Sequence, residues 1–346
     1  MLAQNMAKVV VTILLLAQAV LAGQWRVGKY AGEFMSVGVG ARALGMGGAH
    51  VAVAKDVTAG YWNPAGLAWV TFPQLAAMHA ERFAGVVNYD YVGAALPLGH
   101  ALAVGLTITR TAVDDIPITT RLRNPELALG ELYTENGVVV RNTPYIEKYV
   151  TDAEWVWAVS VARARSSSIS YGATAKVVHK GVGSFAAWGV GFDLGARWNP
   201  IEHLVIGGVV QDVTTTVLVW DSTGTREFVL PTAKWGLAYP LSVRWLRGTI
   251  TPAVDVDIKF EGRKSAAQMS LGQASADWHF GIEYAFRQAV ALRAGSDVGR
   301  LTFGLGVRLP QLDVDYAYLS HDQLGATHRI SLQLTIQKEK FGRREK

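Results

Sequence analysis

Apolar and polar residues alternate with a period of two through most of the chain, from residue 74 onwards. Between Val254 and Phe260, for example, apolar residues alternate with Asp255, Asp257 and Lys259. Because successive side chains of a β-strand point to opposite faces, each such segment predicts a strand with one apolar face and one small or charged face. A soluble β-sandwich shows the same alternation, so the pattern by itself leaves both a sandwich and a membrane barrel open.

The lengths of the strands and of their connections distinguish these alternatives. Most predicted strands have about 9 to 13 residues, longer than the roughly 5 to 6 of soluble sheets and suited to a tilted membrane-spanning strand. Three connections are expected to be long, at 112–152, 214–231 and 261–275, whereas others, such as 97–99 and 165–167, are short. Long loops on one side and tight turns on the other are typical of outer-membrane barrels. We therefore predict an all-β fold, a transmembrane antiparallel β-barrel of about 14 strands over residues 74–337.

The two ends of the chain carry different signals. Lys8 precedes a short apolar run that finishes near Ala22, which predicts a cleaved secretory signal peptide over residues 1–22 and export to the outer membrane. No later segment is long and apolar enough to cross a bilayer as a helix, so a membrane protein of this sequence would cross with strands. After the last strand, the basic stretch 338–346 is expected to form a periplasmic tail.

Composition excludes several classes of protein. With 50% hydrophobic and only 18% charged residues, the chain is too apolar to be disordered. The absence of cysteine excludes disulfides, thiolate metal sites and cysteine nucleophiles. The net charge is +5, but the basic residues are scattered apart from the tail, so we expect no nucleic-acid partner.

The segment 23–73 differs from the rest, because it is rich in glycine and lacks the alternation. We expect it to form a plug or cap of the barrel, with short helices at 51–59 and 64–69 and a tight Asn-Pro turn. A dinucleotide site is the alternative, since residues 38–43 fit G-x-G-x-x-A, but the chain downstream shows no βαβ alternation. The candidate plug residues are Gly38, Gly40, Arg42, Gly45, Gly47, Asp56, Asn63, Pro64, Ala65 and Gly66.

Many charged residues are predicted to point into the barrel, including Asp193, Arg197, Asp255, Asp257, Lys259, Asp277, His279, Glu283, Arg293, Arg300, Arg308, Asp313, Asp315 and Arg329. They could line a polar channel or include a catalytic carboxylate pair. We favour mutual neutralisation, because mixed signs on neighbouring inward faces provide partners and a pair such as Asp255 and Asp257 simply follows the strand period. The histidines lack metal-ligand spacing, and no nucleophile or phosphate-binding motif is present. We therefore expect no enzyme activity, no cofactor and no metal.

Residues 38–67 of the plug segment resemble a known family signature. Its glycine-rich stretch, spaced acid and YWNPAGLA turn are similar to those of the PorV/PorQ family of outer-membrane proteins, which is related to FadL-type transporters of hydrophobic molecules. The segments 230–239 and 313–334 resemble later strands of the same family. The matching residues of the signature are Gly38, Gly40, Ala41, Arg42, Ala43, Gly45, Met46, Gly47, Ala49, Asp56, Tyr61, Trp62, Asn63, Pro64, Ala65, Gly66 and Leu67.

The resemblance implies two alternative functions. Similarity to FadL-type proteins implies passive transport of a hydrophobic small molecule through a plugged barrel, with an apolar pocket beside the plug and a gap in the wall or plug. Similarity to PorV implies a barrel that transports nothing and serves type IX protein secretion or surface attachment, with 112–152 as the contact loop. The expected partners are outer-membrane lipid together with either a hydrophobic ligand or proteins of the secretion system. Fold alone does not decide between these functions.

Overall fold

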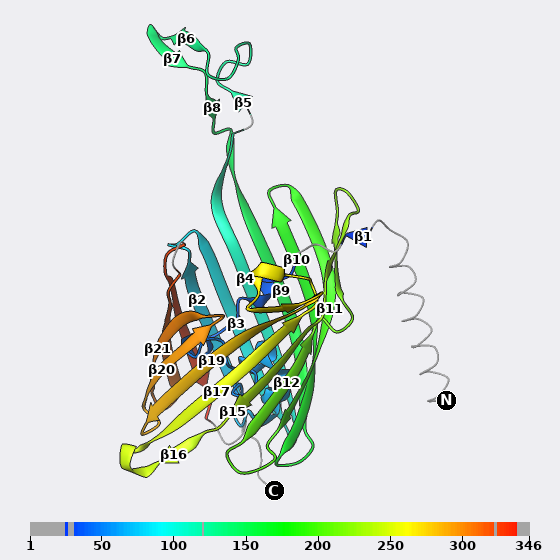
Figure 1. Ribbon diagram of the computed structural model, residues 1–346, viewed down its shortest axis with the longest axis vertical. Helices are drawn as coiled ribbons and strands as arrows, with labels where there is room; N and C mark the ends of the chain where they lie inside the picture. Colours follow the sequence, from blue (N-terminus) through cyan, green and yellow to red (C-terminus); the bar gives the residue numbers. More distant parts are fainter. Residues whose placement is uncertain (1–24, 27–30, 120, 322–323, 338–346) are drawn as a thin grey trace, which may run out of the picture.

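The computed structural model describes residues 25–26, 31–119, 121–321 and 324–337, which form a closed antiparallel β-barrel of 14 strands (Figure 1). The predicted fold class is therefore confirmed, whereas the predicted signal peptide 1–22 and basic tail 338–346 lie outside the described residues. Each strand pairs with the next in the wall, and β23 pairs with β2 to close it. In order, the wall strands are β2 (Gln74–Arg82), β3 (Val87–Leu98), β4 (Leu102–Ile118), β9 (Lys148–Ala164), β10 (Ile169–Val182), β11 (Phe185–Trp198), β12 (Val205–Gln211), β15 (Thr232–Ala238), β17 (Gly248–Lys259), β19 (Ala274–Phe286), β20 (Val290–Asp297), β21 (Arg300–Arg308), β22 (Leu312–Leu319) and β23 (Thr327–Thr335).

The two ends of the barrel differ in their connections. At the end where β2 begins and β23 finishes, which we call the turn end, short turns such as 165–168 and 287–289 join the strands. This end also carries β16 (Leu241–Val243) and the 3₁₀ turn η3 (Arg244–Leu246). At the opposite, loop end, the connection between β17 and β19 contains η4 (Lys264–Ala266) and β18 (Met269–Leu271).

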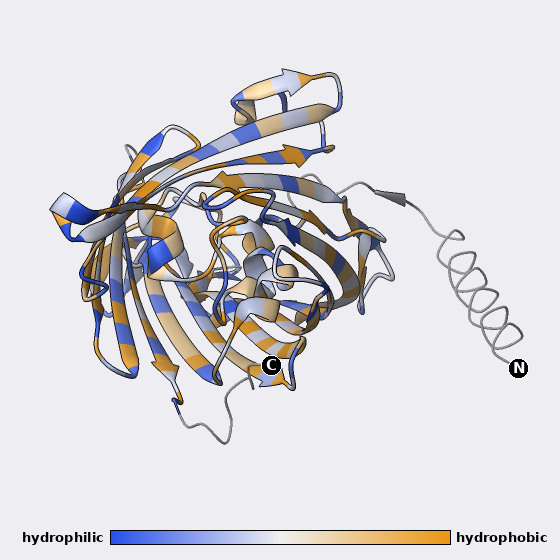
Figure 2. Ribbon diagram, turned by 90° about the horizontal axis from the view of Figure 1, so that it is seen from below, coloured by the Kyte–Doolittle hydropathy of each residue, from blue (hydrophilic) through white to orange (hydrophobic). Residues whose placement is uncertain are grey.

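The alternation of the sequence separates the two faces of the wall. On β11, Phe192 and Leu194 are 43% and 52% exposed on the outer face, whereas Asp193 and Arg197 are buried on the inner face. Figure 2 shows the same change of hydropathy from residue to residue along neighbouring strands. An outer surface of apolar side chains around an inner surface of polar ones is the pattern that a barrel in lipid requires.

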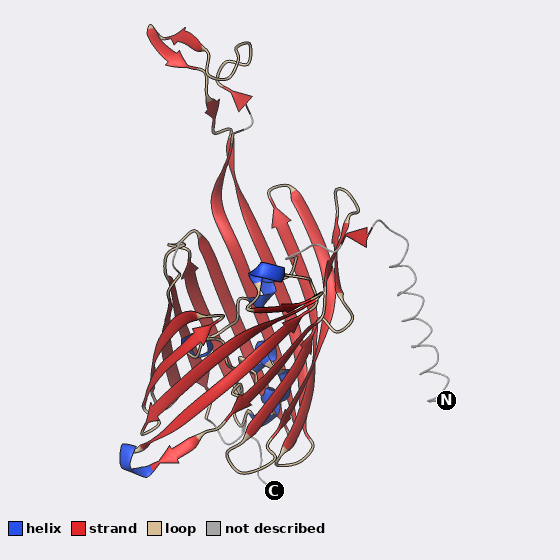
Figure 3. Cartoon of the chain, viewed as in Figure 1, coloured by secondary structure: helices blue, strands red, loops and turns tan. Residues whose placement is uncertain are grey.

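The connection predicted at 112–152 is largely strand. β4 and β9 extend beyond the wall as a paired ribbon up to Ile118 and Lys148, and the tip carries two further two-stranded sheets (Figures 1 and 3). We call residues 119–147 the arm; its strands are β5 (Arg121–Leu122), β6 (Leu132–Glu135), β7 (Val138–Arg141) and β8 (Pro144–Tyr145). The side chain of Asn142 organises the tip by donating hydrogen bonds to the carbonyls of Asn124, Leu127 and Ala128. These strands are defined by pairing with residues remote in sequence, so the local sequence predicted a loop here.

The connection predicted at 214–231 is also mostly strand. It forms a hairpin of β13 (Thr216–Trp220) and β14 (Arg226–Val229), which extends β12 and β15 towards the loop end. β13 pairs with β11, and β14 pairs in parallel with β1 (Trp25–Arg26). The alternation in this stretch is too short to be recognised without its partner strands.

Residues 31–73, which we call the plug, lie inside the barrel (Figures 2 and 3). They form η1 (Glu33–Ser36), α2 (Ala41–Gly45), α3 (Ala59–Trp62) and η2 (Pro64–Trp69), so the helix expected at 64–69 is a 3₁₀ helix. The helix expected at 51–59 is wrong: Asp56 Oδ1 accepts a hydrogen bond from the Thr58 amide, and this local turn replaces it. Among the described residues, no helix is long and apolar enough to cross a bilayer.

Candidate functional site

The plug and the wall are in close contact at several glycine residues. A Cβ atom on Gly195 would lie 2.3 Å from Asn63 Oδ1, and one on Gly281 would lie 2.4 Å from the Met46 carbonyl oxygen. On the plug side, a Cβ on Gly45 would lie 2.9 Å from Cα of Gly304. The plug backbone therefore approaches the wall more closely than any other residue type allows.

At two further predicted positions, glycine is required by the backbone conformation as well as by the lack of space for a side chain. Gly38 and Gly47 adopt φ values of +78° and +64°, which residues with a Cβ rarely do. A Cβ on Gly47 would also lie 2.5 Å from the carbonyl oxygen of Phe280, and one on Gly38 would lie 2.8 Å from the Trp62 ring. The glycine-rich sequence thus fits the bends of the plug to the narrow lumen.

Arg42 connects the plug to one side of the wall. Its guanidinium donates to both carboxylate oxygens of Glu283, at 2.8 and 2.7 Å, and its Nη1 lies 3.7 Å from Asp56. Arg293 donates to Glu283 at 2.7 Å and to Asp315 at 2.6 Å. The predicted residues Arg42 and Asp56 are therefore brought together within a buried charge network that includes the wall.

The Asn63-Pro64-Ala65 turn connects the plug to the other side. Asn63 Oδ1 accepts from the Ala65 amide at 3.2 Å, which caps η2, and its Nδ2 donates to the carbonyl of Ala196 at 3.0 Å. The carbonyl of Ala65 accepts from the Ser170 hydroxyl at 2.9 Å, and Gly66 approaches the Ala54 carbonyl of the plug itself. These bonds join η2 to β10 and β11.

Two wall residues that the sequence placed inside the barrel hold plug backbone. Asp255 Oδ2 accepts from the amides of His50 and Val51 at 2.6 and 2.7 Å, and Arg329 donates to the carbonyls of Gly40 and Val37 at 3.4 Å. Burial, with the nearby charge of Arg42, lowers the pKa of the plug residue His50 to about 3, so its ring is neutral. Sequence reasoning missed these contacts, because nothing local links positions about 200 residues apart.

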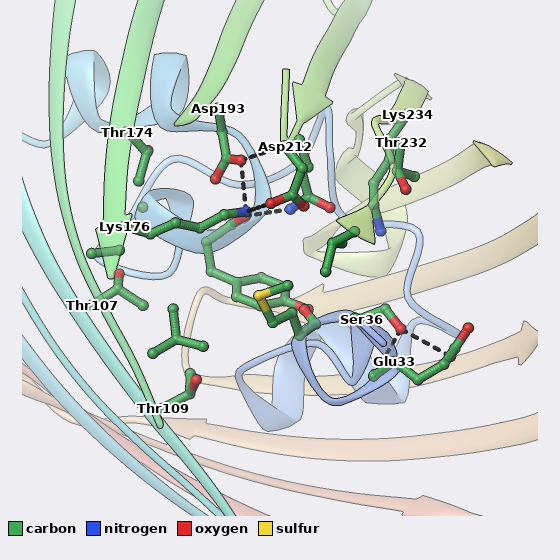
Figure 4. Close-up of a pocket in the computed structure, with 18 of the residues that line it drawn as sticks. Glu33, Ser36, Thr107, Thr109, Thr174, Lys176, Asp193, Asp212, Thr232 and Lys234 are labelled. Atoms are coloured by element: carbon green, nitrogen blue, oxygen red, sulfur yellow. Dashed lines mark hydrogen bonds and ion pairs between the residues drawn. The ribbon is translucent and has the colours of Figure 1, made fainter. Parts of the chain in front are cut away.

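A cavity, which we call the chamber, lies between the plug and the wall (Figure 4). It encloses about 720 Å³, counted to its open mouth. Apolar groups of Met35, Val156, Ala158 and Val229 line it together with threonine hydroxyls. In Figure 4 its charged edge is formed by Lys176, whose ammonium lies 2.8 Å from Asp193 and 2.9 Å from Asp212. The predicted neutralisation of inward charges is observed here and in the Arg42 network.

The chamber reaches an interruption of the wall. β15 pairs with β17 only up to Thr232 and Lys259, and the structure assigns no pairing between β14 and β17 among the described residues. Val229 and Thr232 line the chamber on one side of this interruption, and Lys259 and Glu261 line it on the other. Glu33 of η1 lies between them and forms an ion pair with Lys259 at 3.3 Å.

A larger cavity, which we call the vestibule, opens at the loop end. It encloses about 1260 Å³, again counted to its mouth, between the plug and strands β2, β3, β19 and β23. Its lining is mixed: charged side chains such as Arg82 and Asp277 alternate with apolar ones such as Phe83 and Leu319. The vestibule and the chamber share Glu33, Ser36 and Lys259, so η1 separates the two cavities.

The two neighbouring carboxylates Asp255 and Asp257 form bonds that hold structure. Asp257 is paired with Lys234 at 2.6 Å, while its neighbour Asp255 binds plug amides, so the two carboxylates do not face one reacting position. Among the described residues, no group of three or more histidine or carboxylate side chains could hold a metal ion. The arrangement offers cavities for binding rather than an acid–base constellation.

Solved structures with the same fold include hydrocarbon channels. The Ralstonia pickettii toluene transporter TbuX has a TM-score of 0.57 and 13% identity, with 87% of this chain and 99% of that chain covered. The Pseudomonas putida toluene transporter TodX has a TM-score of 0.54 and 12% identity, with 87% and 99% covered. The CymD monoaromatic hydrocarbon channel has a TM-score of 0.54 and 12% identity, with 87% and 98% covered. No protein-family model matches the chain, and no curated protein is similar to it in sequence. At such low identity the likeness is one of fold: the chain folds as a closed 14-stranded β-barrel like these transporters.

Proposed function

We propose that the chain is an outer-membrane channel for the passive passage of a hydrophobic small molecule. The observation that carries this proposal is the chamber, a partly apolar cavity that lies against the plug and reaches the interruption between β14 and β17. A cavity with apolar walls and few polar groups is the usual form of a small-molecule site. The names of the solved structures with this fold, toluene transporters and monoaromatic hydrocarbon channels, support the same class of ligand.

The outer surface supports a location in a membrane. Large apolar side chains such as Phe192, Leu194 and Phe303 are about half exposed around the wall, which is unfavourable in water and favourable in lipid. Near the loop end, Trp157 stacks on Trp155 and Trp188, as aromatic residues do at a membrane interface. With the signal peptide expected over 1–22, these features favour the outer membrane.

The contacts of the plug favour a lateral route. A ligand would enter the vestibule at the loop end, pass η1 into the chamber and leave between β17 and Phe228–Val229 of β14, with which β1 does not pair. Passage straight to the turn end would require η2 to separate from β10 and β11, to which it is bound by the Asn63 and Ser170 hydrogen bonds. Movement of η1 away from the wall would break its partly exposed ion pair with Lys259 and the packing of Phe34, but no hydrogen bond between its backbone and the wall among the described residues.

The route can be tested by tethering η1 to the wall. A Cβ on Gly32 would lie 2.6 Å from Cγ1 of Val229, so the double variant Gly32→Cys/Val229→Cys brings two cysteines within reach of a disulfide, and the chain has no other cysteine. Bacterial cells that lack a channel of this type would express either protein and take up radiolabelled toluene. We expect the wild-type chain to accelerate uptake, the oxidised variant to slow it to background, and a reducing agent to restore it.

Each outcome of the experiment has a definite meaning. If cells that express the wild-type protein take up toluene no faster than cells without it, the proposed function is contradicted. Uptake that is equally fast with and without the disulfide contradicts the route past η1 but agrees with the proposed transport. Each single cysteine variant serves as a control, since it carries the same local change without a tether.

A second candidate function, suggested by the resemblance to the PorV/PorQ family, is that of a partner in type IX secretion or surface attachment. The arm favours it, because Leu129, Leu132, Val138 and Val139 are each more than 60% exposed at its tip. An apolar tip carried away from the barrel is suited to contact with another protein. Replacing 119–147 by a short turn should abolish capture of secretion proteins and leave toluene uptake unchanged. Capture of secretion proteins that is unchanged without 119–147 would contradict this role of the arm and favour the channel alone.

A further inference from the structure

Polar and aromatic side chains form a continuous row on the outer face of the wall near the loop end, which we call the boundary row. Each member lies directly opposite the next on the neighbouring strand, from β2 to β11. In order, the members are His79, Asp90, Arg110, Trp155, His179 and Trp188.

The outer rows on either side of the boundary row differ in character. Two residues nearer the turn end, the outward positions are largely apolar: Ala77, Val92, Ile108, Trp157, Val177 and Val190. Two residues nearer the loop end, they are polar or small: Glu81, Asn88, Ala112, Ala153, Gly181 and Ala186. The boundary row therefore marks the place where the lipid-facing part of these six strands ends.

Four rings at this boundary form an aromatic patch. The ring centroids of Trp155 and Trp157 are 5.8 Å apart with planes inclined by 2°, and those of Trp157 and Trp188 are 6.2 Å apart with planes inclined by 17°. The His179 ring lies 4.4 Å from that of Trp188, which is 47% exposed. Within the described part of the chain, the three indole N–H groups donate no hydrogen bond. Ring faces beside free N–H donors suit a ligand that offers both C–H groups and hydroxyl oxygens.

The charged part of the row is already neutralised. Nη1 of Arg110 lies 3.5 Å from Asp90, and its Nη2 lies 3.6 Å from Asp114. Asp90 is also bonded to His79 at 2.7 Å, and the Arg110 guanidinium lies 5.8 Å from the Trp155 ring. A lipid phosphate would have to approach two carboxylates to reach this one arginine, which is unfavourable. Uncharged hydroxyl groups can donate to the remaining lone pairs of the carboxylates and accept from the guanidinium.

We propose that the boundary row binds the uncharged sugar head group of a glycolipid in the membrane leaflet at the loop end. The C–H face of a sugar ring would pack on Trp155 and Trp188, where the negative faces of the indole rings attract it. The sugar hydroxyls would bond to Asp90, Arg110 and the indole N–H groups. The acyl chains would lie along the apolar row nearer the turn end, so the whole lipid matches the change in character of the wall. This site lies outside the lumen and is separate from the proposed channel.

The proposal is tested with three lipids that have the same acyl chains. Dioleoyl monogalactosylglycerol carries an uncharged sugar, dioleoylphosphatidylglycerol carries a phosphate, and dioleoylglycerol carries neither. Each would be titrated into the full chain in tetraethylene glycol monooctyl ether, a detergent without sugar, and the bound lipids would be counted by native mass spectrometry. We expect the wild-type chain to bind the galactolipid about tenfold more tightly than either of the other two, because only the sugar uses both parts of the row.

Variants of the row distinguish the sugar contacts from general adhesion of lipid. Trp188→Leu keeps an apolar side chain but removes the ring and its N–H, so galactolipid affinity should fall about fivefold while affinity for the other two lipids stays the same. Asp90→Asn preserves the shape of the row and should weaken galactolipid binding without weakening that of phosphatidylglycerol. Trp278→Leu is the matched control, because Trp278 is also exposed on the outer face and stacks on Phe280 but lies opposite Val256. We expect it to bind all three lipids as the wild type does.

Three results would overturn the proposal. The first is a galactolipid affinity no higher than that for phosphatidylglycerol or dioleoylglycerol. The second is wild-type galactolipid binding by both Trp188→Leu and Asp90→Asn. The third is an equal loss in Trp278→Leu, since any exposed tryptophan would then be sufficient. The assay contains no hydrocarbon substrate, so its result is independent of the toluene uptake that tests the channel.

Discussion

The region where plug and wall meet and the region of the vestibule and chamber use opposite kinds of side chain. In the contact region the inward positions of the wall are often glycine, such as Gly195 and Gly281, and backbone touches backbone. Around the cavities the inward positions carry long side chains, such as Lys176 and Arg82, which stand away from the plug. The difference teaches that the lumen is closed where main chains approach each other, whereas cavities remain where the inward positions carry long side chains.

The largest expected effect tests the ionic part of the contact region. Glu283→Gln removes the carboxylate that Arg42 and Arg293 share, so we expect the free energy of unfolding to fall by about 3–5 kcal/mol. Denaturant titration in detergent, followed by tryptophan fluorescence, measures it. Glu154→Gln breaks a partly exposed pair with Lys180 near the loop end and should cost less than about 1 kcal/mol. Equal losses would mean that the shared carboxylate of the contact region stabilises the protein no more than an ordinary ion pair of the wall.

A smaller effect tests the close approach of backbones. Gly281→Ala places a Cβ 2.4 Å from the Met46 carbonyl oxygen and should lower the free energy of unfolding by about 1–3 kcal/mol. Gly181→Ala makes the same substitution on β10 at the loop end, where a Cβ would meet nothing nearer than 3.3 Å. We expect that variant to stay within about 0.5 kcal/mol of the wild type in the same titration. A harmless Gly281→Ala would mean that the plug can shift freely.

The smallest expected effect compares two buried asparagines. Asn63→Ala removes the cap of η2 and the bond to Ala196, which should cost about 1–2 kcal/mol of unfolding free energy. Asn142→Ala instead removes the hydrogen bonds that organise the arm. Because the arm projects from the barrel, we expect unchanged barrel unfolding but faster protease cleavage of the arm, seen as fragments on a gel. Destabilisation of the barrel by Asn142→Ala would show that the arm is coupled to the wall.

The sequence predicts the wall well and its extensions poorly. Alternation along β11 and β17 is a property of neighbouring residues, so it identifies a strand wherever the repeat is long. The ribbon of β4 and β9 beyond the wall, and the hairpin of β13 and β14, were expected to be loops, because short or polar strands are recognisable only by their partners. Likewise, the helix expected over 51–59 was replaced by a turn, because the Asp56 side chain bonds the backbone locally.

The candidate site also has some features that a local sequence signal predicts and others that it does not. The glycines and the Asn-Pro turn of the plug carry a local conformational signal, so their roles as bends were accessible from the sequence. That Asp255 holds the amides of His50 and Val51, and that Arg329 holds the carbonyl of Gly40, depends on positions roughly 200 to 290 residues apart. Inward orientation was predictable for both wall residues, but their partners were not.

The sequence by itself determined that this chain forms strands with a polar inner and an apolar outer face, and that its glycine-rich beginning cannot belong to the wall. Both follow from the period of two that side chains show along a strand, which residues 23–73 lack. The tertiary structure alone decided which charges are neutralised and where the wall parts beside β14. These outcomes depend on distances between strands remote in sequence, which become defined only when the barrel closes around the plug.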